Sequence, residues 1–406
     1  SMKQMRIAID KGPLTSGHKV RGVGAYTREI IEALKKITKG KKDIKIKPLD
    51  FSTQNSKLPG LAKRSQVPSG IWRSGVGKAQ NFDLVHYTYF HPFFLTLPLK
   101  ACLPVGRPAK TVVTIHDLIQ LIYPNQYPPG LQGKVRFQMQ KYLIKKVDGI
   151  ITVSETSKKD IVRFLGVPAG KIKVIYEAQR EIFRKLEVRG QRLVNIKKKY
   201  GLPERFVLYV GDVNYNKNIM GLIEACKIAK IPLVICGKQA KDIEELGLGL
   251  DVLRGPMDWF RFLFNIPHPE LAHFKDTLDE FQSNRNLIRP GFVPDKDLVA
   301  IYNLASVYCQ PSFYEGFGLP VLEAMACGTP VVCAKTQALV EIAGDAALFA
   351  DPQKPKDMAE KISELIRSAE RENKLIKMGL QRVKIFSWRK AAEETVEVYK
   401  SVGGVQ

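Results

Sequence analysis

The chain is 406 residues long, enough for two or three domains, and it carries 64 lysines and arginines against 40 aspartates and glutamates. The charge is uneven: residues 1–200 hold 39 basic and 13 acidic side chains (net +26), whereas the other 206 residues hold 25 and 27 (net −2). No apolar run approaches the roughly 18–20 residues that span a bilayer, which argues against membrane-spanning helices, and the basic half predicts a nucleic acid, an anionic membrane surface or a phosphorylated substrate as partner.

Short β-branched runs alternate with helical patterns in the first half of the chain. Residues 5–10 (MRIAID) predict a strand, and residues 24–37 predict a helix with one apolar face. Ser154 is placed to cap a further helix at 155–166. The remaining strands are predicted at 82–87, 111–117, 149–154 and 171–176.

The second half repeats this scheme. Strands are predicted at 206–211, 232–237, 306–311 and 330–334, and helices near 294–304, 319–328 and 387–402. Strands that alternate with helices predict parallel, doubly wound sheets. A polar and basic stretch near 180–200 separates the two series, so we predict two Rossmann-like α/β domains, at 1–185 and 200–387.

Three segments depart from the alternation. Residues 52–80 are rich in Gly, Pro and Ser, are basic, and predict a long mobile loop. Residues 87–105 are aromatic and interrupted by prolines, and residues 238–286 place about fifty residues, with small helices of their own, between two strands.

The six cysteines form no C-x-x-C pair, and several lie in apolar runs. This usage predicts buried free thiols in a reducing compartment. No signal peptide pattern precedes MRIAID, so we expect a soluble, cytoplasmic protein, either free or peripheral on the inner face of a membrane.

In parallel sheets, ligands bind at the loops that follow the strands, and two such loops in the first half hold candidate residues. Gly22 and Gly24 (RGVGAYT) precede a helix, where backbone amides could approach an anion; an ordinary loop is the alternative. His116 and Asp117 (VTIHDL) end a strand, and they are either functional residues or a packed histidine beside a helix cap.

Two loops in the second half predict a nucleotide site. In YVGDVNYNKN, Gly211 ends a strand, Asn218 can cap the next helix, and Lys217 lies beside that helix N-terminus, where a cation is disfavoured unless an anion joins it. We therefore expect a phosphate there, with a solvated lysine as the alternative. In RPGFVPDKDL, the backbone near Val293 could contact a planar base, with an ordinary turn as the alternative.

The strongest signal is the segment PSFYEGFGLPVLEAMACGTPVV at 311–332. A strand gives way to a glycine-containing bend and then to a helix with Pro320 in its first turn, where proline fits. Glu315 stands in the bend, and Glu323 follows eight residues later, one turn into the helix. Two carboxylates beside a glycine bend suit the hydroxyl pairs of a polyol.

This segment resembles the E-x7-E signature of the retaining nucleotide-sugar glycosyltransferases with the GT-B fold, group one (family four). RGVGAYTRE, VTIHDL, ITVSETSKKDI and YVGDVNYNKN stand in the same order and spacing, so the resemblance covers almost the whole chain. It implies an acceptor domain, a nucleotide-sugar domain and a cleft between them. It also implies that the last helix, within 388–406, crosses back to the first domain.

The resemblance also implies residue roles. Glu323 would hold the ribose hydroxyls, Lys217 and the Gly22 and Gly24 amides would neutralise the diphosphate, and His116 would lie near the reacting face of the sugar. The catalytic candidates are thus His116, Lys217 and Glu315, and no metal or other cofactor is expected. The donor-binding candidates are Gly22, Gly24, Gly211, Lys217, Val293, Glu315, Gly316, Phe317, Gly318, Leu319 and Glu323.

One departure from the family pattern concerns charge. Many relatives pair the lysine with a nearby arginine, but the loop at 211–218 has none. Either Lys217 acts with backbone amides only, or a basic residue of the first domain completes the site, and Arg21 is a candidate for it. The expected partners are a nucleotide-sugar donor, a glycan or lipid-linked acceptor and an anionic membrane surface. The alternatives are a nucleotide-sugar hydrolase and a basic nucleic-acid-binding protein, but no nucleic-acid module is recognisable.

Overall fold

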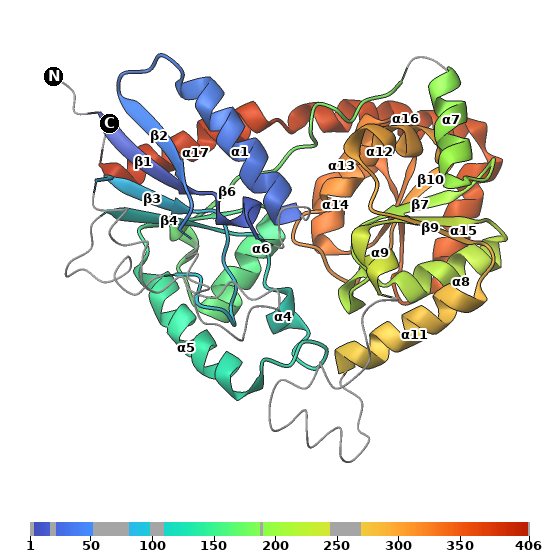
Figure 1. Ribbon diagram of the computed structural model, residues 1–406, viewed down its shortest axis with the longest axis horizontal. Helices are drawn as coiled ribbons and strands as arrows, with labels where there is room; N and C mark the ends of the chain where they lie inside the picture. The colour runs from blue at the N-terminus through green and yellow to red at the C-terminus, as the bar shows by residue number, and fades with distance from the viewer. Residues whose placement is uncertain are drawn as a thin grey trace, which may run out of the picture. The chain divides into compact units, whose positions relative to one another are not determined.

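Two six-stranded parallel sheets organise the computed structural model (Figure 1), which describes residues 4–16, 22–51, 81–97, 109–186, 190–243 and 269–404. The chain divides into two units, each with one sheet. Unit 1 comprises Ser1–Pro124, Pro128–Glu177 and Phe386–Gln406, and unit 2 comprises Asn125–Tyr127 and Ala178–Ile385. The C-terminal helix therefore belongs to the same unit as the N-terminal strand.

The sheet of unit 1 has the strand order β2-β1-β3-β4-β5-β6. Its strands are β1 (Met5–Asp10), β2 (Ile44–Leu49), β3 (Leu84–Tyr87), β4 (Lys110–Ile115), β5 (Gly149–Thr152) and β6 (Ile172–Val174). Its helices are α1 (Gly22–Thr38), α4 (Ile119–Ile122), α5 (Gly130–Lys146), α6 (Glu155–Asp160), which continues as a π-helical turn at Ile161–Leu165, and α17 (Trp388–Gly403).

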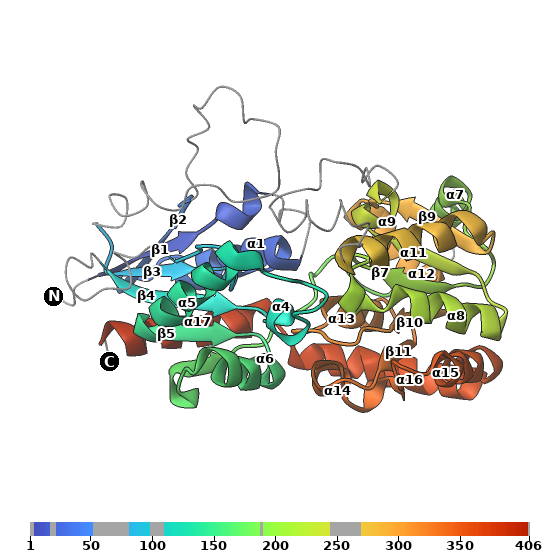
Figure 2. The same ribbon diagram turned by 90° about the horizontal axis from the view of Figure 1, so that it is seen from below.

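Alternation along β1 sends side chains to two cores, one on each face of this sheet. Ile7 and Ile9 pack with residues of α1 and α17, whereas Ala8 lies in the cluster that contains Leu143 of α5 and Ile161. Figure 1 shows α1 and α5 on different sides of the strands, and in Figure 2, seen from below, α5 lies in front of them. Helix α17 is thus an integral part of the unit 1 core.

The sheet of unit 2 has the order β12-β11-β10-β7-β8-β9. Its strands are β7 (Val207–Val210), β8 (Leu233–Cys236), β9 (Leu287–Gly291), β10 (Val307–Gln310), β11 (Val331–Ala334) and β12 (Leu348–Ala350). Its helices are α7 (Gln191–Tyr200), α8 (Ile219–Ala229), α9 (Lys238–Asp242), α11 (Pro269–Ser283), α12 (Asp295–Leu304), α13 (Leu319–Ala326), α14 (Gln337–Ala343), α15 (Pro355–Arg367) and α16 (Ala369–Arg382).

Strand order reverses direction once in each sheet, and ligands of doubly wound folds bind at such a switch point. In unit 2 the switch lies between β7 and β10, and in unit 1 it lies between β1 and β3. The loops after these strands are therefore where a ligand site is expected.

The predicted Rossmann-like architecture is confirmed, and Ser154 does cap α6 by accepting a hydrogen bond from the Ser157 amide. Strands β2 and β12 were missing from the sequence prediction, whereas β9 occupies the place of the strand expected after the 238–286 insertion. Five cysteines are free and buried, as expected: Cys226, Cys236, Cys309, Cys327 and Cys333. Residues 52–80, 98–108 and 244–268, including most of the loop and insertion predictions, lie outside the described residues.

Candidate active site

Lys217 and Glu315 meet in unit 2 at the switch point of the sheet. The Lys217 ammonium lies 2.8 Å from each oxygen of the Glu315 carboxylate. Lys217 ends a single 3-10 turn after β7, and Glu315 stands in the bend after β10. Because β7 and β10 are adjacent, two residues 98 positions apart come into contact. An anion was expected beside Lys217, and in this structure the Glu315 carboxylate takes that place.

Glu315 is held by further donors. Its Oε1 accepts from the Ser312 hydroxyl at 2.6 Å and from the Gln310 side-chain amide at 2.8 Å. Gln310 in turn accepts from the hydroxyl of Tyr308. Glu315 was predicted to stand at the mouth of a site, but only 7% of it is exposed. A buried carboxylate that accepts from three donors is fixed in orientation.

The bend from Gly316 to Leu319 owes its shape to backbone geometry. Gly318 has a φ of +107°, and a Cβ at this position would lie 2.7 Å from the Leu339 side chain, so a larger residue does not fit. Phe317 is buried, and Leu319 begins α13, with proline following in the first turn. The bend therefore places the positive end of the α13 dipole directly after Glu315.

Glu323 belongs to a different network from Lys217 and Glu315. Its Oε2 accepts from the Tyr302 hydroxyl at 3.1 Å, and its Oε1 lies 3.6 Å from the Arg180 guanidinium, which also pairs with Asp295 at 2.5 Å. Burial raises the pKa of Glu323 to about 7, although Arg180 and Tyr302 oppose the shift. This carboxyl therefore titrates near neutral pH.

Two other predicted donor residues and one predicted helix cap lie in the loops of unit 2. Gly211 follows β7, and a Cβ there would lie 2.7 Å from the Tyr209 hydroxyl. Val293 is buried after β9, whereas its neighbour Phe292 is 58% exposed. Asn218 was predicted to cap α8, but its side chain instead donates to the carbonyls of Pro311 and Pro352. The Asn218 prediction was wrong because this amide ties α8 to neighbouring loops.

His116 lies in unit 1, directly after β4, with both ring nitrogens hydrogen-bonded. Nδ1 lies 3.1 Å from the Glu177 carboxylate, and Nε2 lies 3.1 Å from the Thr88 carbonyl. Both partners are acceptors, so both nitrogens must donate, which only the imidazolium can do. Burial lowers the pKa of His116, but Glu177 and the Thr88 carbonyl outweigh burial and the pKa is raised overall.

Gly22 and Gly24 do not precede the first helix, as the sequence predicted, but lie within the first turn of α1. The early amides of a helix have no partner within it, so these positions remain consistent with an anion site. Asp117 accepts a hydrogen bond from the Ile119 amide, which fits the capping alternative. Arg21 lies outside the described residues.

Sequence reasoning missed two charged residues that hold candidate site residues. Glu177 holds His116, and Arg180, three positions later, holds Glu323. Both lie in the segment YEAQRE, which directly follows β6. Its position after the carboxyl end of a strand was the available signal.

Comparison with known proteins gives concordant results. Residues 194–382 match the model of "Glycosyl transferases group 1", and residues 56–178 match that of "Glycosyltransferase Family 4". The chain is 30% identical over 329 residues to O-antigen chain mannosyltransferase B of Escherichia coli, covering 78% of this chain and 75% of that protein.

Solved structures share the fold. Sucrose-phosphate synthase from Thermosynechococcus elongatus matches with a TM-score of 0.69 and 21% identity, over 99% of this chain and 100% of that one. HepE of Anabaena in complex with UDP-glucose matches with a TM-score of 0.66 and 16% identity, over 98% and 100%. With the two switch-point loops and the E-x7-E segment in place, the chain belongs to the group 1 (family 4) glycosyltransferases of the GT-B fold.

Proposed function

We propose that this protein is a retaining glycosyltransferase that moves a sugar from a nucleoside-diphosphate sugar to a glycan or lipid-linked saccharide in envelope polysaccharide synthesis. The observation that carries the proposal is the Lys217–Glu315 pair at the switch point of unit 2, followed by Glu323 eight residues later. The similarity to an O-antigen mannosyltransferase supports the pathway and makes mannose the first sugar to test.

In the proposed reaction, departure of the nucleoside diphosphate builds negative charge near Lys217 and the start of α13. Fixed positive charge at that place is often the largest single contribution to catalysis. The diphosphate would compete with Glu315 for the lysine, and Glu315 would bind hydroxyls of the donor sugar. Glu323 would bind the ribose hydroxyls. In unit 1, a cationic His116 would supply positive charge and would not serve as the base, since both its nitrogens are occupied.

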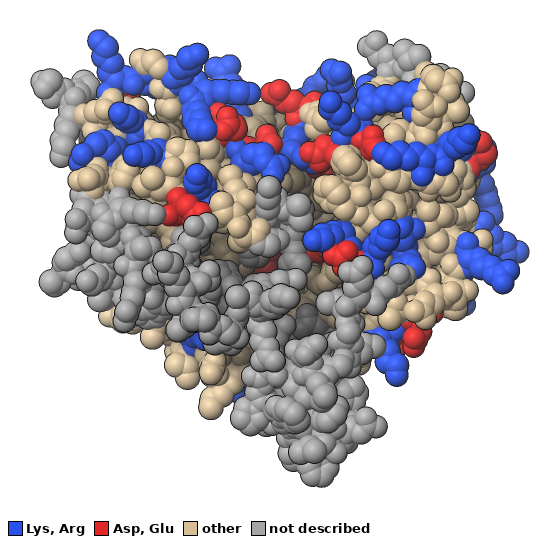
Figure 3. All heavy atoms as spheres, in the orientation of Figure 1, with Lys and Arg blue, Asp and Glu red and all other residues tan. Residues whose placement is uncertain are grey.

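Two rival functions call for different results. A nucleotide-sugar hydrolase would consume donor at the same rate with and without acceptor. A nucleic-acid-binding protein would bind DNA with a steep salt dependence. On the face drawn in Figure 3, basic side chains are spread over both units with acidic ones among them, which does not favour a single nucleic-acid groove.

A thermal-shift panel of nucleotides and nucleotide sugars tests the donor class directly. A ligand present at 100 times its Kd should add about 2.7 kcal/mol to the free energy of unfolding. Stabilisation by a nucleoside diphosphate and its sugar derivative, with none by unrelated nucleotides, supports the proposal. No response to any member would contradict it.

Glu323→Gln should remove a pH dependence from both nucleotide binding and stability. The folded state holds a proton up to about pH 7 that the unfolded chain releases near 4.5, so this group lowers stability by up to about 3 kcal/mol as pH rises through that window. Nucleotide affinity should rise over the same window, because the carboxylate is the better acceptor. The variant should lack both trends and should bind a nucleoside diphosphate about 10- to 100-fold more weakly at pH 8.

Calorimetry at pH 5.5, 7 and 8.5, together with urea unfolding at each pH, measures both effects. Because the nucleotide's own phosphate also titrates near pH 6, the comparison is the difference between parent and variant. Equal nucleotide affinity of the two proteins at pH 8.5 would show that the ribose assignment to Glu323 is wrong.

We also expect turnover to survive removal of divalent metals. In the described ranges, no three His, Cys, Asp or Glu side chains are grouped to share a metal ion, and Lys217 with the α13 N-terminus can provide the positive charge. Dialysis against a chelator followed by a donor-turnover assay measures this. Loss of turnover that Mg²⁺ or Mn²⁺ restores would show the reverse.

The basic loop at 52–80 is also the segment that we expect to contact an anionic membrane, and because it lies outside the described residues this contact stays a prediction. None of the described helices combines the length and apolar character needed to cross a bilayer.

A further inference from the structure

Helix α5 of unit 1 presents a line of apolar side chains to solvent. Leu131 is 81% exposed, Val135 61% and Tyr142 53%, which places three of the five most exposed large apolar side chains of the described residues on one helix. Spacings of four and seven residues put them on the same face. The opposite face is buried through Leu143 and Ile144, so this helix is already packed without the exposed line.

The charges on α5 all have one sign. The helix has no acidic residue, and in the part of the chain that the structure describes, none of its basic side chains forms an ion pair. Lys134, Lys141 and Lys145 recur at spacings of seven and four, so they follow one side of the apolar line. The basic residues of α5 are Lys134, Arg136, Lys141, Lys145 and Lys146.

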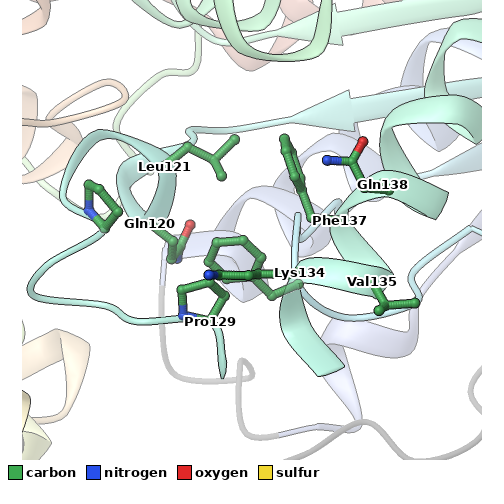
Figure 4. A pocket seen from close by; sticks show the side chains of 9 residues that line it. Gln120, Leu121, Pro129, Lys134, Val135, Phe137 and Gln138 are labelled. Atoms are coloured by element: carbon green, nitrogen blue, oxygen red, sulfur yellow. The ribbon is translucent and has the colours of Figure 1, made fainter. Parts of the chain in front are cut away.

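An apolar pocket opens beside the same face. It has a volume of about 370 Å³ and is lined by residues of α4 and α5 together with Phe93, Pro124 and Pro129 (Figure 4). The apolar lining comes from Phe93, Leu121, Pro124, Pro129, Val135 and Phe137. Gly133 of α5 allows Pro129 to pack closely against the helix, because a Cβ at this position would lie 2.8 Å from the Pro129 side chain. Lys134 contributes to the lining as well, so a cation stands beside an apolar recess.

These features together favour one occupant. Protein interfaces are depleted of lysine, whereas interfacial membrane helices combine lysines with an exposed apolar line. Lysines near an anionic leaflet are attracted to its surface potential, and an adjoining apolar recess of this size can receive part of an acyl chain. None of the three exposed side chains belongs to the core clusters formed by the described residues of unit 1, so this line is free to contact a surface outside the fold.

We propose that the α5 face, defined by Leu131, Val135 and Tyr142 with Lys134, Lys141 and Lys145, docks unit 1 on an anionic phospholipid bilayer. The apolar side chains enter the headgroup layer, and the lysines contact lipid phosphates. A lipid-linked acceptor would be presented at such a surface, but the docking itself does not require the proposed transferase reaction.

Vesicle co-sedimentation tests the docking with the full chain. The parent should pellet with phosphatidylglycerol-containing vesicles at low salt, pellet less at 0.5 M salt, and stay in solution with pure phosphatidylcholine. Lys134→Gln/Lys141→Gln/Lys145→Gln should weaken partitioning by about fivefold per lysine. Leu131→Gln/Val135→Gln/Tyr142→Gln should also lose binding. A matched control on α7, Val194→Gln/Lys198→Gln, changes an equally exposed valine and lysine and should pellet like the parent.

Each variant is also tested for nucleoside diphosphate binding, which separates this inference from the proposed function. Retained nucleotide binding with lost vesicle binding in both α5 variants supports the docking. Vesicle binding by both α5 variants that equals the parent's, or equal binding to neutral vesicles, overturns it and leaves the proposed reaction untouched. As a second readout, Leu131→Trp should gain a blue-shifted fluorescence component with anionic vesicles only; an unshifted spectrum counts against insertion.

Discussion

Lys217→Met should lower donor turnover by about 10²- to 10³-fold, the usual effect of removing one group that stabilises charge in the transition state. It should also destabilise the protein by about 1.5–3 kcal/mol, because Glu315 loses a charged partner in a site where its side chain is only 8% exposed. Turnover with saturating donor, and urea unfolding of the same preparations, measure the two effects.

A double variant separates catalysis from stability. In Lys217→Met/Glu315→Gln no buried carboxylate is left without its cation, and the new amide can still accept from Ser312 and Gln310. This variant should recover stability toward the parent's value but remain inactive. If Lys217→Met keeps more than a tenth of the parent's turnover, Lys217 does not stabilise the leaving diphosphate.

Glu177→Gln should lower turnover by about 10- to 100-fold without unfolding unit 1, because a charged hydrogen-bond partner of His116 becomes neutral while its acceptor oxygen is kept. The raised pKa of His116 depends on the hydrogen bond and charge of Glu177. A histidine with a raised folded pKa contributes stability below about 6.5, which is lost as pH rises through the folded value. In the variant, whose folded pKa is lower, this loss should be smaller and should be complete at a lower pH.

Glu181→Gln is the matched control, since Glu181 lies in the same segment and is exposed. NMR titration of the His116 ring and pH profiles of turnover distinguish a positioning role from a merely structural one. A His116 pKa that is equal in Glu177→Gln and the parent would contradict the assignment.

The alternation of strands and helices was enough to predict two parallel sheets, because each strand and helix carries its own periodicity. It was not enough for the outer strands. β2 reads IKIKPL, with lysines at alternate positions, and β12 has only three residues, so neither shows the continuous apolar run of a buried parallel strand.

The site was predicted only as far as local motifs reach. The segment from Glu315 to Glu323 was found because its residues are close in the chain. The partners Glu177, Arg180 and Tyr302 were not, since their contacts depend on strand order, which no local pattern states. The burial of Glu315 and Glu323 could not be predicted for the same reason. A motif specifies residue types, whereas the exposure of a side chain depends on which strands lie beside it.

The segment that joins the units has a mechanical consequence. Glu177 is anchored within unit 1 by His116, and Arg180 is anchored within unit 2 by Glu323 and Asp295. Ala178 and Gln179 lie between the two anchored residues, so a hinge at this crossing would centre on them. In a rotation about these two residues, Glu177 would stay with His116 in unit 1, and Arg180 would stay with Glu323 in unit 2. The candidate catalytic groups would therefore keep their local geometry.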